Sequence, residues 1–383
     1  MTLLNPLILS AVWACLPNSE CPELECAKAC LHQAKQHQQQ GQYSVAETLL
    51  RRAVKMSAEE GSAMLEALNQ LAGVLFLKAE YEEAEATVRR ALRLQPQQEE
   101  QKDLKQGESL NTLAEILRAR GRFSEADLAQ KQSLAIFETR LGKDHPSTLT
   151  IQENRASLLA QVGRLHEAIT ISRSVLAARE RLPEPNSPYL ATTLSNLAGY
   201  EIAIGNALNV EPLYRRALAI REQAGAHHPE VAVLLNNLAE CLRREGKERE
   251  AEPLYRRALN IQEMRPELHP DYATTLNNWA EFLAARRHGK EAEASYRKAL
   301  AIAQGALGRN HLLVATIQEN LARHLQSSRR NEEAKTLLQQ ALEIRFQRQG
   351  TQHPDAIKTL LALDRLEGRR SSPTRSVGIR ALR

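Results

Sequence analysis

The sequence of 383 residues predicts an all-α protein, an α-solenoid built from about eight helix-turn-helix repeats. Good helix formers dominate the composition, and aromatic residues make up only 4% of it. The stretch EAEPLYRRALNI (250–261) has a near twin 41 residues earlier, NVEPLYRRALAI (209–220). The same amphipathic pattern recurs along most of the chain at a nearly constant spacing, which indicates stacked copies of one helical unit.

Pairs of small residues seven positions apart mark the second helix of each predicted repeat. The first residue of each pair is Ala46, Ala84, Ala126, Ala168, Val210, Ala251, Ala292 or Ala334, at steps of 38, 42, 42, 42, 41, 41 and 42 residues. Apolar residues around them follow the i, i+3, i+4, i+7 spacing of an amphipathic helix. We expect small residues there because helices that cross closely leave no room for longer side chains.

A first helix precedes each of these, as in VLLNNLAECLRREGK (233–247). Several first helices end at a glycine that turns the chain: Gly41, Gly121, Gly163, Gly205 and Gly246. The links between repeats carry His145-Pro146, Ser187-Pro188, His228-Pro229, His269-Pro270, His311-Leu312 and His353-Pro354. Because proline suits the first turn of a helix, these pairs predict where the first helices begin.

Two recurring positions are predicted to be core rather than functional. Tyr214, Tyr255 and Tyr296 share one position on the second helix, where packing is expected. Cys241 and His324 share one position on the first helix, which apolar residues hold in other repeats.

These patterns together resemble the tetratricopeptide repeat, in particular its kinesin light chain-like subclass. The period of 41–42 residues, the NNLAE and AEPLYRRAL helices and the His-Pro link carry the resemblance, which covers roughly residues 27–368. It implies a right-handed superhelix whose first helices line a concave groove. It also implies that asparagines on those helices hold the backbone of a bound peptide.

The predicted organisation has three parts. Residues 1–26 form an apolar, cysteine-containing N-terminal segment, residues 27–369 the solenoid, and residues 370–383 a basic disordered tail. The first repeat, with HQAKQHQQQ in its leading helix, is expected to be a polar end cap, and residues 353–368 a closing helix.

Asparagines are the candidate binding residues. Asn154, Asn196, Asn237, Asn278 and Asn320 each stand fourteen residues before a second-helix anchor, and Asn236 and Asn277 precede two of them. Asparagine costs up to about 0.7 kcal/mol relative to alanine inside a helix, so a compensating contact is expected. A carboxamide can form hydrogen bonds to the backbone of a peptide whatever the side chains of that peptide are. The alternative is that each asparagine bonds to the neighbouring repeat.

Neighbouring charges would set the preference for a ligand. Glu240, Arg244 and Glu281 lie on the same face as the asparagines, so the predicted peptide-binding surface has mixed charge and indicates a ligand with some acidic character. The alternative is that these charges are simply solvated.

Other functions lack a signature in the sequence. The phosphate-binding, nucleophile-elbow and zinc-protease motifs are absent, so no enzyme and no cofactor is predicted. The spacings of Cys15, Cys21, Cys26 and Cys30 lack CxxC pairs, and the repeated histidines lie too far apart to share one ion. The formal net charge is +5, of which four charges lie on residues 370–383, so a broad nucleic-acid surface is not expected.

The predicted function is that of a scaffold or adaptor for an unidentified protein or peptide. The alternative is a self-associating structural subunit whose groove holds its own chain, and a further one is nucleic-acid binding through the basic tail. The apolar start MTLLNPLILSAVWACL is too short to span a bilayer and lacks a basic n-region. A cytoplasmic location is therefore predicted, with export or lipid anchoring through the first 15–20 residues as the alternative.

Overall fold

Helices account for all the regular secondary structure of the described residues in this computed structural model. These residues are 23–39, 42–57, 62–78, 80–94, 99–183, 187–206, 210–264, 269–351 and 353–368. The helices are α2 (Glu23–Gln39), α3 (Tyr43–Met56), α4 (Ser62–Leu77), α5 (Tyr81–Arg93), α6 (Glu99–Ala119), α7 (Phe123–Leu141), α8 (Pro146–Gln161), α9 (Leu165–Glu180), α10 (Pro188–Ala203), α11 (Val210–Ala224), α12 (Pro229–Arg244), α13 (Glu248–Glu263), α14 (Pro270–Ala285), α15 (Gly289–Leu307), α16 (Leu312–Ser327), α17 (Asn331–Gln349) and α18 (Pro354–Leu366). The predicted all-α class is confirmed.

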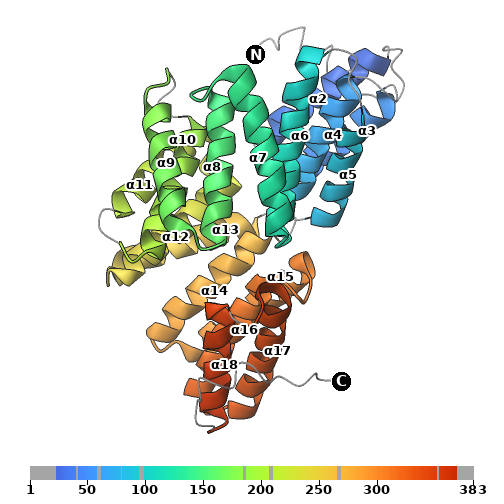
Figure 1. The fold of residues 1–383 in the computed structure, drawn as a ribbon. Helices are drawn as coiled ribbons and strands as arrows, with labels where there is room; N and C mark the ends of the chain where they lie inside the picture. Colours follow the sequence, from blue (N-terminus) through green and yellow to red (C-terminus); the bar gives the residue numbers. More distant parts are fainter. Residues whose placement is uncertain are drawn as a thin grey trace, which may run out of the picture. The chain divides into compact units, whose positions relative to one another are not determined.

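The chain divides into two units, Met1–Leu234 and Leu235–Arg383. In the first, the pairs α2/α3, α4/α5, α6/α7, α8/α9 and α10/α11 pack in chain order, and the leading helices α4, α6, α8 and α10 contact one another (Figure 1). In the second, α13 to α18 pack in the same order, with α14 against α16. Stacked helix pairs of this kind form an α-solenoid of repeats, as predicted.

The small anchors pack where helices cross. All eight, from Ala46 to Ala334, have no exposed surface. The expected core positions are also buried: Tyr214, Tyr255 and Tyr296 are at most 4% exposed, and Cys241 is 3% exposed. His324 is half-buried, and its Nε2 lies 3.0 Å from the carbonyl oxygen of Gly289.

Each described turn inside a repeat needs a left-handed residue at one position. The second residue after the leading helix has positive φ in six described repeats and after the closing helix, and it is glycine in five of these places: Gly121, Gly163, Gly205, Gly246 and Gly368. Arg287 and Arg329 hold the same position at φ 63° and 60°. The glycine prediction is therefore confirmed for these turns, while Gly41 lies outside the described residues.

Arg329→Gly is expected to stabilise the protein by about 0.5–1 kcal/mol. A left-handed conformation costs an L-residue about 1–2 kcal/mol, and part of this gain is offset by the greater backbone entropy that glycine loses on folding. Denaturant unfolding of the variant checks this. The reverse change at the equivalent turn, Gly121→Arg, serves as the control and should lower stability, and a loss of stability in both variants would contradict the explanation.

The links between repeats hold a feature that the sequence patterns did not predict. Proline begins α8, α10, α12, α14 and α18, as expected. The residue before α8, α10, α12, α14, α16 and α18 also caps the helix, because its side chain accepts a hydrogen bond from the backbone N–H two residues later. The caps are His145 (3.2 Å), Ser187 (3.2 Å), His228 (3.2 Å), His269 (3.2 Å), His311 (3.1 Å) and His353 (3.2 Å).

Candidate functional site

The leading helices present the predicted asparagines at one register. Asn154 lies on α8, Asn196 on α10, Asn237 on α12 and Asn278 on α14, and all four are half-buried. Asn236, Asn277 and Asn320 are more enclosed, at 4%, 6% and 8% exposed. A period near 42 residues repeats the face of each leading helix, so these side chains hold the same position on their own helices within each unit.

In the second unit five carboxamides form one hydrogen-bonded chain, which we call the asparagine chain. Asn320 Nδ2 donates to Asn277 Oδ1 at 3.0 Å, and Asn277 Nδ2 donates to Asn278 Oδ1 at 3.3 Å. Asn278 Nδ2 donates to Asn236 Oδ1 at 3.1 Å, and Asn236 Nδ2 donates to Asn237 Oδ1 at 3.2 Å. These bonds link three leading helices and compensate for asparagine inside a helix.

The first unit follows the same rule. Asn154 Nδ2 donates to Asn111 Oδ1 at 3.1 Å, and Asn196 Nδ2 donates to Glu153 Oε1 at 2.9 Å. Each asparagine thus bonds to the residue one position before its equivalent in the preceding repeat. Contact between neighbouring repeats, the alternative drawn from the sequence, is present in the structure, and peptide contact stays a prediction.

Glu153 is a member of this site that the sequence patterns missed. It is 2% exposed, and its Oε1 also accepts from Ser172 Oγ at 3.1 Å. Burial raises the pKa of its carboxyl, although the hydrogen bond from Asn196 and the charge of Arg179 act in the opposite direction. Its position in the repeat could have identified it, because Glu153 occupies the position that Asn236 and Asn277 occupy in other repeats.

Glu240 is the centre of a charged cluster on α12. Arg243 donates to its two carboxylate oxygens at 2.7 and 2.8 Å, Arg244 Nε donates at 2.7 Å, and the hydroxyl of Tyr255 donates at 3.0 Å. Burial alone raises the pKa of Glu240, but the hydrogen bonds and charges of Arg243 and Arg244 outweigh burial and lower it. Glu240 is therefore an ionised carboxylate whose charge is balanced by Arg243 and Arg244, and it positions both guanidinium groups.

Glu281 joins this cluster to the asparagine chain. Its carboxylate lies 3.8 Å from Arg243 Nη2 and 3.6 Å from Arg323 Nη1. Arg323 Nη2 also donates to Asn320 Oδ1 at 3.1 Å. The side chains of Arg244 and Arg323 are 56% and 63% exposed, so two guanidinium groups of this surface remain largely in solvent.

The surface is thus richer in donors than in acceptors. All ten predicted residues lie on leading helices, and the structure brings Asn236, Asn237, Asn277, Asn278, Asn320, Glu240, Arg244 and Glu281 together in the second unit, with Asn154 and Asn196 in the first. Amide and guanidinium N–H groups bind carbonyl and carboxylate oxygens. Such a surface can hold a polypeptide.

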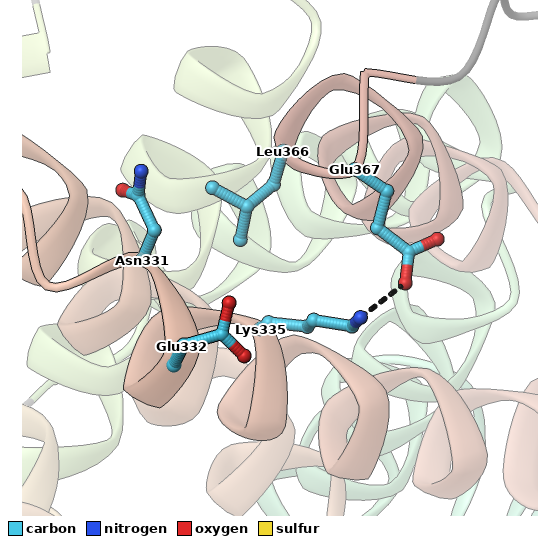
Figure 2. A pocket seen from close by; sticks show the side chains of 5 residues that line it. All are labelled: Asn331, Glu332, Lys335, Leu366 and Glu367. Atoms are coloured by element: carbon cyan, nitrogen blue, oxygen red, sulfur yellow. Dashed lines mark ion pairs between the residues drawn. The ribbon is translucent and has the colours of Figure 1, made fainter.

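A shallow polar pocket lies elsewhere, between α17 and α18. Asn331, Glu332, Lys335, Leu366 and Glu367 line a volume of about 360 Å³ (Figure 2). Lys335 and Glu367 point toward each other across it, with Nζ and Oε1 3.0 Å apart. The pocket contains none of the predicted asparagines, and the ion pair spans it, so it is not the candidate site.

The described part of the chain also bears on metal and membrane sites. No group of three or more histidine, cysteine, aspartate or glutamate side chains there could hold a metal ion. The helices described in this structure do not include a candidate membrane span. Cys15 and Cys21 lie outside the described residues, and so does the basic tail.

Comparisons with known proteins agree with the repeat architecture. A family model described as tetratricopeptide repeat matches residues 63–139, 147–223, 201–264 and 271–347. The structure of a Rap protein complexed with competence and sporulation factor has a TM-score of 0.56 at 14% identity, and the match covers 94% of this chain and 91% of that one. No curated protein sequence matches the chain.

Two further solved structures show shorter matches. Nearly identical TPR-like repeats of a protein from Podosopora anserina, described as a kinesin light chain, are 25% identical over 54% of this chain and 98% of theirs, with a TM-score of 0.43. BtubC (BKLC) from P. vanneervenii is 22% identical over 59% of this chain and 90% of its own, with a TM-score of 0.44.

Proposed function

Because this chain belongs to the tetratricopeptide repeat family, we propose that it is a protein-interaction scaffold that holds an extended segment of a partner on its leading helices. The observation that carries the proposal is a half-buried carboxamide at the same helix position in both units, on α8 and α10 in the first and on α12 and α14 in the second. A Rap protein of the same fold has been crystallised with competence and sporulation factor, so an array of this kind can accommodate a bound partner.

The spacing of the asparagines suits an extended polypeptide. Leading helices in contact lie roughly 8–10 Å apart. An extended chain advances about 3.3–3.6 Å per residue, so successive asparagines would meet it about every third residue. In the second unit, Asn237, Asn278 and Asn320 would therefore accompany about six to seven residues of ligand.

The bonds between repeats leave part of this surface for a ligand. Asn237 uses its Oδ1 to accept from Asn236, and within the described residues its Nδ2 donates to no protein group. Asn154 and Asn196 use Nδ2 in the bonds to the preceding repeat. Their Oδ1 atoms can accept from backbone N–H groups, while Arg244 and Arg323 can donate to carbonyl or carboxylate oxygens.

The triple variant Asn237→Ala, Arg244→Ala, Arg323→Ala is expected to lose at least about tenfold in affinity for ligand peptides. Three lost contacts need to supply only about 1.4 kcal/mol in sum for that change. The probe is a synthetic peptide selected from a phage-displayed library of random 15-residue sequences on the unaltered chain, and fluorescence polarisation measures its Kd.

The matched control changes the same residue types at second helices, with Arg297→Ala on α15, Asn331→Ala on α17 and Arg330→Ala at the N-cap of α17. It should keep the Kd of the unaltered chain. Equal affinities of the test and control variants, with circular dichroism showing both folded, would refute the leading-helix surface. A chain ending at Gly368 that binds the peptide more tightly than the full chain would instead support the alternative in which the basic tail occupies the groove.

A further inference from the structure

The closing helix α18 exposes a side that the leading helices α8, α10, α12, α14 and α16 bury. Ile357, the fourth residue after the cap His353, is 37% exposed. The fourth residue after the cap is at most 1% exposed in the other five helices, where it is Leu149, Ala191, Ala232, Ala273 or Ala315. Because each of these helices begins directly after its cap, the positions can be compared one by one.

The same difference continues along one face of α18. Leu360 and Asp364 follow Ile357 at the i+3 and i+7 positions of a helix, and both are half-buried. The residue that corresponds to Asp364 is alanine in the other five helices and has no exposed surface: Ala156, Ala198, Ala239, Ala280 and Ala322. We call Ile357, Leu360 and Asp364 the α18 stripe.

In a complete repeat this side is covered by the second helix of the same repeat. Leu149 of α8 belongs to one hydrophobic cluster with Val175 and Ala178 of α9, and Ala156 of α8 belongs to another with Ala168 of α9. Because α18 is the last helix of the described residues, no second helix of its own repeat covers the α18 stripe there. The complete repeats therefore show on which side of α18 a further segment would pack.

The α18 stripe changes character from its start to its end. Ile357 and Leu360 make the part near the helix start apolar, whereas Asp364 places a carboxylate near the helix end. The exposed Glu332 lines the pocket beside that end (Figure 2). A segment that fits this side therefore needs cationic groups near the end of α18 and apolar groups near its start.

The chain itself continues with a segment of matching composition. Residues 369–383, which we call the C-terminal segment, contain five arginines and no aspartate or glutamate. Arg369, Arg370 and Arg375 come first, and the apolar Val377 and Ile379 follow them. A segment that runs back along α18 passes the end of the helix before it reaches the start. Its cationic and apolar groups therefore come in the order that the α18 stripe requires.

Gly368 turns the chain in the direction that this arrangement needs. Its φ is 65°, within the left-handed region that the glycines of the turns inside repeats also use before the chain runs back as a second helix. Ile357 lies about 16 Å from Gly368 along the helix axis. The residues from Gly368 to Val377 can span about 30 Å in an extended chain, so they reach the apolar part of the α18 stripe.

We propose that the C-terminal segment packs along the α18 stripe of its own chain and closes the array where a complete repeat has its second helix. Its first arginines lie near Asp364 and Glu332, and Val377 and Ile379 cover Ile357 and Leu360. Because the segment is tethered at the end of α18, its effective concentration there is roughly millimolar, so a weak contact is enough to hold it. The α18 stripe contains none of the predicted binding residues, so the proposal does not depend on the proposed peptide binding.

Trypsin cleavage of the full chain measures this contact, because the bond after Arg375 is cut only while the segment is away from α18. The variant Ile357→Ala, Asp364→Ala, the stripe variant, gives α18 the residues that α10, α12, α14 and α16 carry at these two positions, so it should stay folded. Its cleavage after Arg375 is expected to be at least about threefold faster than in the unaltered chain, followed by mass spectrometry of the released peptides. Cleavage after Arg365, within α18, should stay as slow as in the unaltered chain.

Two further variants show whether the effect belongs to the α18 stripe. The control Lys358→Ala, Arg365→Ala changes exposed residues of α18 outside the stripe and should not speed cleavage after Arg375. The triple variant used above for peptide binding should also leave that rate unchanged. Equal rates in the unaltered chain and the stripe variant would overturn the proposal, and so would a faster rate in the triple variant, since the segment would then occupy the leading helices.

A photocrosslink locates the segment while α18 itself stays unaltered. A benzophenone amino acid takes the place of Ile379 in the full chain, and mass spectrometry identifies the residues to which it attaches. Attachment within residues 353–364 of the same chain is expected. An equal mixture of unlabelled and nitrogen-15-labelled chains separates contacts within one chain from contacts between two copies. Attachment to α8, α10, α12, α14 or α16 instead, or only to a second copy, would contradict the proposal.

Discussion

Replacing Arg345 by methionine is expected to lower the free energy of unfolding by about 3–5 kcal/mol, because it leaves the Glu319 carboxylate in a largely buried place without its partner. Arg345 is 5% exposed on α17. Its Nε and Nη2 donate to the two carboxylate oxygens of Glu319 on α16 at 2.6 and 2.9 Å. This bidentate pair joins two helices of the last full repeat.

The effect should be largest at α18. Thr359 on α18 donates to the same Glu319 carboxylate, and Arg345 Nη1 lies 3.4 Å from Asp355. The closing helix therefore depends on a pair formed between the two helices before it. Denaturant unfolding measures the total loss, and hydrogen exchange should show the amides of α18 losing protection first.

The arginine at the N-cap of the same helix supplies the control, because Arg330 pairs with Glu333 and Glu293 on the surface. Arg330 and Glu333 have side chains 44% and 35% exposed, and Arg330→Met should cost less than about 1 kcal/mol. The double variant Arg345→Met, Glu319→Leu should recover most of the stability, since it removes both charges together. Losses of similar size in Arg345→Met and Arg330→Met would show that the buried pair contributes no more than a surface pair.

Gly107→Ala is expected to destabilise the protein by about 1–3 kcal/mol, although alanine is normally the better helix former. A Cβ at Gly107 on α6 would lie 2.6 and 2.9 Å from ring atoms of Phe137 on α7. Ser133 on α7 donates to the carbonyl oxygen of Gly107 at 2.7 Å, which holds the two helices at this distance. Phe137 is 4% exposed and packs among Leu134, Ile151 and Leu104, so a ring that gives way must disturb this packing.

Gly73→Ala is the matched control and should have the opposite sign. Gly73 lies inside α4, and a Cβ there would meet no atom within 4 Å. Alanine should therefore stabilise by about 1 kcal/mol through helix propensity alone. Thermal and denaturant unfolding of the two variants gives the comparison, and stabilisation by both changes would show that α6 and α7 do not approach as closely as described.

The fold was predictable because its signals are local and repeated. The anchors from Ala46 to Ala334 recur every 38–42 residues, and their total burial follows from the same helix crossing in each repeat. The glycine turns and the prolines at helix starts depend on the backbone of one or two residues. Because the chain contains eight copies of these signals, the copies can be compared with one another within a single sequence.

The candidate site was predictable in its residue types and its face, but not in its bonds. The register of Asn154, Asn196, Asn237, Asn278 and Asn320 could be read from the period. The acceptor of each asparagine could not, because it lies one position before the equivalent residue of another repeat. Glu153 was missed for that reason. Its carboxylate accepts a hydrogen bond from Asn196 only because α8 and α10 pack against each other.

Helical periodicity, the small anchor residues and the turn chemistry by themselves determined that this chain is an α-solenoid of tetratricopeptide-like repeats, since each acts within a few residues of chain. Tertiary structure alone decided the asparagine chain, the Arg345–Glu319 pair and the close approach at Gly107, because these depend on distances between side chains on different helices. The histidine caps, although local, also required coordinates, because His-Pro links favour a helix start whether or not the ring accepts a hydrogen bond.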